Sequence, residues 1–298
     1  MLTKVELMMR DMVSRLDPYT LKLYDKLPAG KRLRAKLILK IASNQDSAIK
    51  LASIIELIHA ASLLHDDVID DADSRRGVSS LNALYGNKSA IMLGDILYSK
   101  GFSELTSFDS KISSSIADAV AMLSVGELMD VELSKKINFN ESLYFDMIYK
   151  KTAVLIESSA KSAAILSGKD PEIFALYGKN LGLAFQIIDD VLDIISDSTM
   201  LGKPAMHDFK EGKTTLPYIY LFEAMNKEED IEELKSLYKK DLTQKEEIWI
   251  QTKMTEYGVI EKSILVAKKL GEEALDAIAK ENDQVLEDII KSMIEREF

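Results

Sequence analysis

Cysteine is absent from this chain, and only three of its 298 residues are histidine. Disulfide bonds and thiolate metal sites are therefore excluded, and a histidine-rich zinc site is not expected. Proline and glycine are also few, with five and thirteen residues, which disfavours an all-β or loop-rich fold. The formal charge of −11 disfavours a broad nucleic-acid surface, so we expect no nucleic-acid partner.

Long apolar runs are missing as well. No stretch of eighteen apolar residues occurs, so we predict no membrane span. Charged residues interrupt the apolar residues of positions 1–17, which is not the pattern of a signal peptide, and we expect a cytoplasmic protein. The P-loop pattern GxxxxGK[ST] does not occur either, so a phosphate group would have to be bound in another way.

Helical periodicity dominates the sequence that is present. Apolar residues occupy nearly every face of 46–70 and 174–196, which predicts two helices buried on most sides. No linker or low-complexity segment divides the chain, so we predict a single all-α domain spanning 1–298. Further helices are expected at 3–24, 32–43, 88–107, 111–136, 141–168 and 215–226, with several shorter ones from about 228 to 298.

Each of the two apolar helices ends in an acidic DDxxD motif. The first and last aspartates of a motif lie four residues apart and share a helix face, where like charges repel. A helix C-terminus also favours cations over carboxylates. Oxygen ligands without histidine or cysteine suit Mg²⁺, which often shares the oxygens of a bound phosphate group. The six carboxylates are Asp66, Asp67, Asp70, Asp189, Asp190 and Asp193.

A single DDxxD motif is usually a solvated helix face. Two copies that break local rules in the same way, both at the ends of apolar helices, favour a functional site. A calcium loop is the competing interpretation of 71–77, but two arginines stand at its ligand positions and no glutamate closes it.

Cationic residues accompany both acidic motifs. Arginine forks match phosphate oxygens, and lysines add point charges. Taken singly, each of these residues is an ordinary surface cation, and only their placement beside the acidic motifs favours a phosphate site. They are Lys31, Arg32, Arg34, Arg75, Arg76, Lys151, Lys203 and Lys213.

These motifs together resemble the trans-isoprenyl diphosphate (polyprenyl) synthases, over about residues 28–220. The resemblance implies the isoprenoid synthase fold, an all-α bundle of about ten or more helices around a central active-site cavity. It rests on GKRLR at 30–34, ELIHAASLLHDDVIDDADSRRG at 56–77, GNKSAIMLGDILYSKGF at 86–102, KTA at 151–153 with FQIIDDVLDI and GKP within 185–204, and DFKEGKTTLP at 208–217.

The resemblance also implies an activity. Such an enzyme condenses isopentenyl diphosphate with an allylic diphosphate, repeatedly, to an all-trans polyprenyl diphosphate. The departing diphosphate is expected to accept the proton that is lost, because the sequence shows no obvious general base. The family is further expected to bind three Mg²⁺ per active site and to form homodimers.

The resemblance assigns roles to individual residues. The six aspartates would hold the Mg²⁺ ions, with Asp190 and Asp193 acting partly through water. The catalytic set is Asp66, Asp67, Asp70, Asp189, Asp190, Lys151 and Lys203. The allylic diphosphate would contact Arg75, Lys151, Thr152, Gln186, Lys203 and Lys213, and isopentenyl diphosphate would contact Lys31, Arg34, His59 and Arg76.

The sequence departs from the family pattern at three positions. Ala29 and Ala35 stand where glycine and proline are common, and neither is an expected ligand. His207 replaces an aspartate that is often seen there, while the adjacent Asp208 remains, so at most one outer carboxylate is lost.

Product length is predicted from Ala61 and Ser62, which lie five and four residues before Asp66. Helix periodicity places one or both on the face of Asp66, one turn deeper, where their small side chains leave room for a growing chain. We therefore predict a medium- or long-chain product, beyond geranylgeranyl diphosphate. The bland interpretation is that these small residues only allow close helix packing.

Four other functions remain as alternatives. A geranylgeranyl or farnesyl diphosphate synthase would carry the same motifs. A class I terpene cyclase also uses DDxxD but usually lacks the GKR segment. A silent partner subunit usually loses acidic residues, and all six are present here. A helical scaffold with surface acids would need neither substrate.

Overall fold

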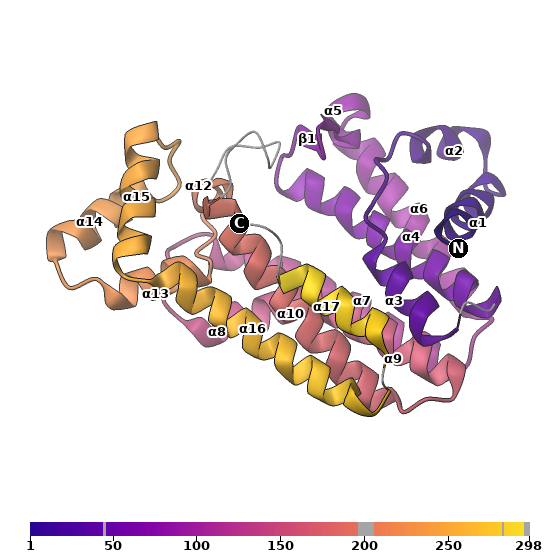
Figure 1. Ribbon diagram of the computed structural model, residues 1–298. Coiled ribbons are helices and arrows are strands. Elements are labelled where there is room, and N and C mark those ends of the chain that lie inside the picture. Colours follow the sequence, from indigo (N-terminus) through magenta and orange to yellow (C-terminus); the bar gives the residue numbers. More distant parts are fainter. Residues whose placement is uncertain (44–45, 196–205, 282, 295–298) are drawn as a thin grey trace. The chain divides into compact units, whose positions relative to one another are not determined.

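The computed structural model describes residues 1–43, 46–195, 206–281 and 283–294 (Figure 1). Apart from one hairpin of two-residue strands, every regular element in these ranges is helical, which confirms the all-α prediction. The chain forms two compact units, one made of Met1–Val120 with Leu155–Ala175 and the other of Ala121–Val154 with Leu176–Phe298. The single domain over 1–298 stays a prediction.

The first unit is organised around α4 (Asp46–Ile69), whose residues 51–58 are all buried. This helix packs against α1, α3, α5 and α6. The remaining elements of the unit are α1 (Leu2–Ser14), α2 (Pro18–Tyr24), α3 (Leu33–Ile41), β1 (Ser74–Arg75), β2 (Val78–Ser79), α5 (Leu81–Tyr85), α6 (Asn87–Leu105), the first part of α7 (Ser110–Leu133), nearly all of α9 (Val154–Ser167) and the first turn of α10 (Pro171–Ile195).

Two glycines allow α6 to lie close against α4. A Cβ atom on Gly94 would lie 2.3 Å from His65 Nε2, and one on Gly101 would lie 2.9 Å from Ile58 Cγ1. The two glycines are two helical turns apart and so face the same way. The end of α4, which carries the first acidic motif, is therefore fixed against α6.

The predicted helix over 3–24 is wrong in one respect, because it is two helices. The Asp17 side chain accepts hydrogen bonds from the backbone N–H groups of Tyr19 and Thr20 and caps α2. Pro18 occupies the first helical position, where its missing N–H costs nothing. The cap and the proline start a new helix where periodicity alone suggested continuation.

The second unit contains most of α10, the helix that carries the second acidic motif. Tyr177 of α10 donates a hydrogen bond of 2.8 Å to the Leu286 carbonyl and so ties the last helix to it. The other elements are the rest of α7, α8 (Glu141–Ile148), α12 (His207–Glu211), α13 (Leu216–Ala224), α14 (Glu228–Leu237), α15 (Gln244–Glu256), α16 (Val259–Ile278), a 3₁₀ turn (Ala279–Glu281) and α17 (Gln284–Ile294).

The helix predicted over 141–168 is confirmed from Glu141 to Ser167, but it is not α-helical throughout. Between α8 and α9 the chain winds as π helix over Tyr149–Ala153. Two glycines lie against this segment: a Cβ on Gly126 would lie 2.3 Å from Lys151 N, and one on Gly182 would lie 2.5 Å from Ala153 Cα. Single π turns inside α helices are frequent at functional sites, and this one carries Lys151 and Thr152.

Helices α4 and α7 are long and apolar enough to cross a membrane by length and composition alone. The most apolar window of α4 is 72% buried within the protein, and that of α7 is 39% buried. Two such helices are weak evidence for a membrane span, because the core helix of a soluble protein meets the same criterion.

Candidate active site

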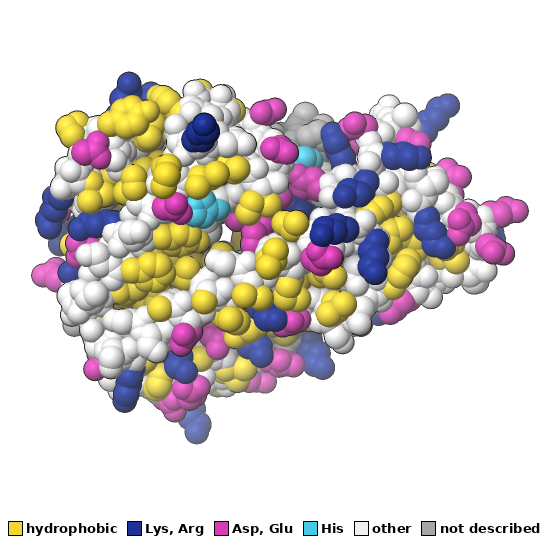
Figure 2. All heavy atoms as spheres, turned by 180° about the vertical axis from the view of Figure 1, so that it is seen from behind, with side chains coloured by type: hydrophobic (Ala, Val, Ile, Leu, Met, Phe, Trp, Pro, Cys, Tyr) yellow, Lys and Arg dark blue, Asp and Glu magenta, His cyan; other side chains and the backbone are white. Residues whose placement is uncertain are grey.

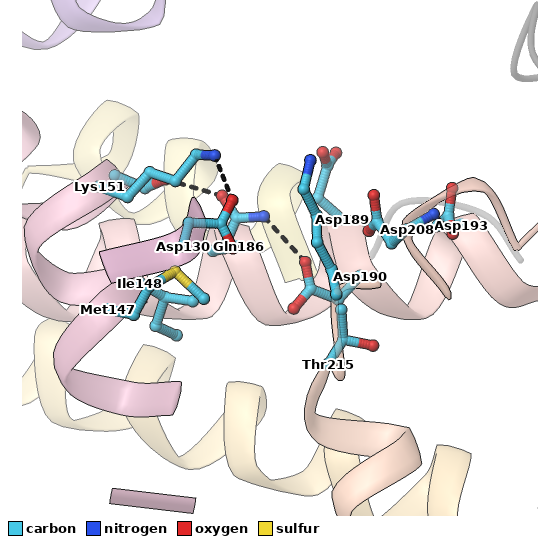
Figure 3. A pocket seen from close by; sticks show the side chains of 12 residues that line it. Asp130, Met147, Ile148, Lys151, Gln186, Asp189, Asp190, Asp193, Asp208 and Thr215 are labelled. Carbon is cyan, nitrogen blue, oxygen red and sulfur yellow. Dashed lines mark hydrogen bonds and ion pairs between the residues drawn. The ribbon is translucent and has the colours of Figure 1, made fainter. Parts of the chain in front are cut away.

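A pocket in the second unit gathers seven of the residues predicted from the sequence (Figure 3). They are Lys151, Thr152, Gln186, Asp189, Asp190, Asp193 and Lys213. The pocket is completed by Asp130, Met147, Ile148, Asp208 and Thr215. Its polar atoms therefore come from α7, the π-helical segment, α10 and the segment around α12.

Asp190 is the buried centre of a hydrogen-bonded chain across the pocket. Its carboxylate accepts hydrogen bonds from the Tyr144 hydroxyl at 2.6 Å and from Gln186 Nε2 at 2.8 Å. Gln186 in turn accepts one from the Thr152 hydroxyl at 2.8 Å. Burial raises the pKa of Asp190 well above its usual range, and the charge of Asp208 adds to this. A nearby cation would favour the ionised form.

The other two aspartates of the motif differ from Asp190. Asp189 is exposed on α10, whereas Asp193 is buried. The Asp193 carboxylate accepts the backbone N–H of Asp208 at 3.1 Å, and its carbonyl accepts that of Met206 at 2.7 Å. Asp193 therefore holds the start of α12 against the end of α10, and this brings Asp208 into the pocket.

Lys151 lies beside two buried carboxylates. Its Nζ lies 2.6 Å from Asp130 Oδ2 and 3.0 Å from Glu127 Oε2. Burial opposes its charge, but Asp130 and Glu127 outweigh burial and raise the pKa of Lys151. Lys151 is therefore a permanent cation on the pocket wall, and Figure 3 shows Asp130 and Lys151 pointing toward one another.

Lys213 is held by Glu211, with 2.6 Å between Nζ and Oε2. Glu211 also lies 2.9 Å from His207 Nε2. Burial opposes the charge of Glu211, but hydrogen bonds from His207 and Lys213 lower its pKa to about 2. His207, which replaces an expected aspartate, thus contacts Glu211, and Glu211 in turn holds Lys213.

The first acidic motif lies in the first unit, at the end of α4. Asp66 and Asp70 are partly exposed, whereas Asp67 is buried and accepts a hydrogen bond of 2.6 Å from Arg75 Nε. Burial raises the pKa of Asp67, and Arg75 counteracts this. Arg75 lies on β1, directly before the hairpin turn.

That turn holds Arg76 in an unusual backbone conformation. Arg75 pairs with Val78, so Arg76 and Gly77 form a two-residue loop with φ values of 55° and 75°. Positive φ at both positions is typical of a type I′ turn, which favours asparagine and glycine. The Arg76 guanidinium donates a 2.8 Å hydrogen bond to the Ala29 carbonyl, next to the GKRLR segment.

Arg34 and His59 are half-buried, and each has one buried side-chain nitrogen. Arg34 Nε and His59 Nδ1 have no hydrogen-bond partner in the described part of the chain. Burial lowers the pKa of His59 well below its usual range, and the charges of Arg34, Arg75 and Arg76 lower it further. Arg34 therefore offers a donor that an anion could accept, while His59 is neutral.

For the remaining predicted residues the structure gives a position without a role, or does not describe the residue. Ala61 and Ser62 are both buried, and Ser62 donates to the His59 carbonyl at 2.9 Å, so their role in product length stays a prediction. Lys31 is exposed at the start of its segment. Lys203, with the GKP segment, lies outside the described residues.

Several site residues were not predicted from the sequence. Asp130, Glu127 and Tyr144 hold Lys151 and Asp190, and Glu56 pairs with the predicted Arg32 beside Arg34. Glu56 carries a detectable signal, since it is a charged residue within a long apolar run. The other residues lie far along the chain from the residues that they hold and show no comparable signal.

The donor set of the pocket fits a hard cation. Carboxylate, amide and hydroxyl oxygens make up its acceptors, as Mg²⁺ and Ca²⁺ require. Within the described ranges, no group of three or more aspartate, glutamate or histidine side chains lies close enough together to hold a metal ion without other ligands. A bound cation would therefore share its remaining positions with water and substrate oxygens, as Mg²⁺ commonly does.

Comparisons with known proteins show what this chain is similar to. A short chain isoprenyl diphosphate synthase of Methanothermobacter thermautotrophicus is 38% identical over 243 residues, which are 76% of this chain and 74% of that protein. Solanesyl diphosphate synthase 3 of Arabidopsis thaliana is 44% identical over 177 residues, or 58% of this chain. The match spans less than half of that plant protein, 42% of its length.

Solved structures cover the whole fold. The octaprenyl pyrophosphate synthase of Helicobacter pylori superimposes with a TM-score of 0.95 and 41% identity, covering 99% of this chain and 98% of that one. A polyprenyl synthase of Caulobacter crescentus, solved with calcium and isoprenyl diphosphate, gives a TM-score of 0.92 and 27% identity over 99% and 94% of the two chains. The predicted isoprenoid synthase fold is thereby confirmed.

A family model described as polyprenyl synthetase matches residues 19–254, which is well over half of the chain and includes both acidic motifs. This chain therefore belongs to the polyprenyl synthetase family.

Proposed function

We propose that the chain is a trans-polyprenyl diphosphate synthase, which condenses isopentenyl diphosphate repeatedly with an allylic diphosphate. The observation that carries this proposal is the pocket of the second unit, where lysines, an amide and aspartates from distant segments converge. The pocket is both anionic and cationic, as a site for a diphosphate with a divalent cation must be. Family membership supports the same activity.

The allylic diphosphate is assigned to the cationic residues. Lys151 and Lys213 supply charge in the pocket, and Thr152 holds Gln186, which in turn holds Asp190. Arg75 and Lys203 complete the proposed contacts. Holding the reacting groups in place and stabilising the charge of the departing diphosphate are the main tasks of such a site.

Three Mg²⁺ ions are the proposed cofactors. Asp66, Asp67, Asp70 and Asp189 are the proposed ligands, with Asp190 and Asp193 in support. Asp189 is exposed, while Asp190 and Asp193 already accept hydrogen bonds, which supports this division. Bound Mg²⁺ would act as a Lewis acid that stabilises the leaving diphosphate.

Isopentenyl diphosphate is assigned to the arginine cluster of the first unit. The proposed contacts are Lys31, Arg34, His59 and Arg76. Arg34 offers a buried donor, and burial, together with the cations around it, lowers the pKa of His59 and keeps it neutral. The proton lost after condensation passes to the departing diphosphate, since His59 lies among positive charges that oppose its protonation.

The product is proposed to be longer than geranylgeranyl diphosphate. The small side chains of Ala61 and Ser62 support this, as does the likeness to an octaprenyl pyrophosphate synthase. A geranylgeranyl or farnesyl diphosphate synthase is the second candidate, and the name of the short chain relative favours it.

A homodimer of single-domain subunits is proposed, located in the cytoplasm. Hydrophobic side chains are exposed in patches on the face shown in Figure 2. Among the exposed apolar residues are Ile91 and Met92 on α6, and Met122, Val125 and Leu128 on α7. Exposed apolar stripes on helices suit packing against another subunit.

The test is an assay of diphosphate release and product length. The protein is incubated with Mg²⁺ and farnesyl diphosphate, with and without isopentenyl diphosphate, and extracted products are sized by chromatography. The proposal requires both substrates and a ladder of products beyond C20. Release from the allylic substrate alone would indicate a terpene cyclase, and no release in either case would contradict an active synthase.

A further inference from the structure

A buried glutamate on α4 reaches across to the segment that precedes α3. Glu56 is only 2% exposed and lies in a run of otherwise apolar buried residues. Its Oε1 accepts the backbone N–H of Ala35 at 3.0 Å, and its Oε2 lies 3.3 Å from Arg32 Nη1. A buried carboxylate costs free energy unless it is paired and hydrogen-bonded, and Glu56 has both kinds of partner.

The segment that Glu56 contacts is held in a conformation it would not adopt by itself. Arg32, the residue before α3, has φ of 53°, in the left-handed region that arginine disfavours. The first amides of a helix need acceptors, and Arg32 offers no side-chain cap within the described structure. Glu56 supplies an acceptor and a negative charge at this helix start from a different helix.

Glu56 also offsets the charge of the arginine cluster. Arg75 is paired with Asp67, and Arg32 is paired with Glu56. The charge of Glu56 favours the ionised forms of Arg34 and Arg76 as well. Four arginines around a neutral histidine would repel one another in an empty site, and Glu56 counters that repulsion.

We propose that Glu56 is a positioning residue of the isopentenyl diphosphate site. It fixes the 30–35 segment by a backbone hydrogen bond and an ion pair, so that Arg34 and Lys31 keep one arrangement before substrate arrives. This inference rests on the proposed function of the arginine cluster. Loss of Glu56 should therefore weaken binding of isopentenyl diphosphate and leave the allylic substrate unaffected.

The test compares Glu56→Gln with wild type in steady-state kinetics, varying each substrate in turn. The amide keeps the shape and one acceptor but removes the charge, so KM for isopentenyl diphosphate should rise about tenfold, as expected for a charge-assisted contact. KM for farnesyl diphosphate should not change. Glu104→Gln is the matched control, because Glu104 on α6 pairs with Lys50 and Lys100 away from the cluster.

Arg32→Gln gives an independent readout if Glu56→Gln does not fold. It should shift KM in the same direction, and the double variant should be no worse than the worse single one, because the two residues act as a pair. Equal changes in both KM values, or none, in a folded variant would overturn the inference while wild-type turnover upholds the proposed function. A wild type that does not condense the two substrates would overturn both.

Discussion

Gly126→Ala is the most direct test of the π-helical segment. The added Cβ would lie 2.3 Å from Lys151 N and 2.6 Å from Lys150 C, while ordinary contact begins at 3.4 Å. Backbone atoms cannot rotate away as a side chain can, so the segment must move by about 1 Å. That displacement would carry Lys151 and Thr152 with it.

The Gly126→Ala substitution should affect both the stability and the activity of the protein. Overpacking costs about 1–3 kcal/mol, and the better helix propensity of alanine returns about 1 kcal/mol. The free energy of unfolding should therefore fall by roughly 1 kcal/mol, which lowers Tm by only about 2–4 °C. Activity is the sharper readout, because misplacing a catalytic group by 1 Å can cost about a hundredfold in rate.

Gly258→Ala serves as the control. Gly258 has φ of +62° with no described atom within 4 Å of the added Cβ, so the strain is confined to the backbone at a cost of about 1–2 kcal/mol. Differential scanning fluorimetry and single-turnover rates would be measured for both variants. A Gly126→Ala protein that turns over at the wild-type rate would refute the argument that this glycine places Lys151.

Three further predictions concern the acids and the product. Asp189→Ala or Asp66→Ala should remove most activity with Tm unchanged, and near-normal turnover at ordinary Mg²⁺ concentration would rule out the metal assignment. Ala61→Tyr should shorten the products seen by chromatography, and an unchanged ladder would disprove the tunnel hypothesis. Glu211 has a pKa lowered from 4.5 to about 2, so its ionised form stabilises the protein above pH 4.5, and this stabilisation is lost as pH falls toward 2. Glu211→Gln should therefore reduce the free energy of unfolding by roughly 2–3 kcal/mol at pH 7, with no difference near pH 2, as measured by urea titration.

Long, strongly periodic helices were the most predictable part of the fold. The predicted helices at 46–70 and 174–196 correspond to α4 and α10, with ends displaced by at most three residues. Their apolar faces decide both their existence and their burial. The break at Asp17 and Pro18 could also have been read from the sequence, since the cap and the proline stand side by side.

The π turn and the partners of the site residues could not be predicted in the same way. The sequence around Lys151 keeps α-helical periodicity and gives no sign of a π turn. The turn depends instead on Gly126 and Gly182, which pack against it from other helices. Tyr144 and Asp130 likewise act on residues more than twenty positions away. Motifs identify groups that face a substrate, whereas groups that hold them in place depend on tertiary contacts.

The hairpin turn at Arg76 has a consequence for protein engineering. Type I′ turns favour Asn-Gly, so Arg76→Asn would relieve a backbone strain of about 1–2 kcal/mol and should raise the melting temperature. A selection for heat resistance would therefore favour this substitution, and the surviving protein would lack a guanidinium assigned to substrate. Thermal screening of variant libraries should be coupled to a turnover assay at this position, because here the two selections oppose each other.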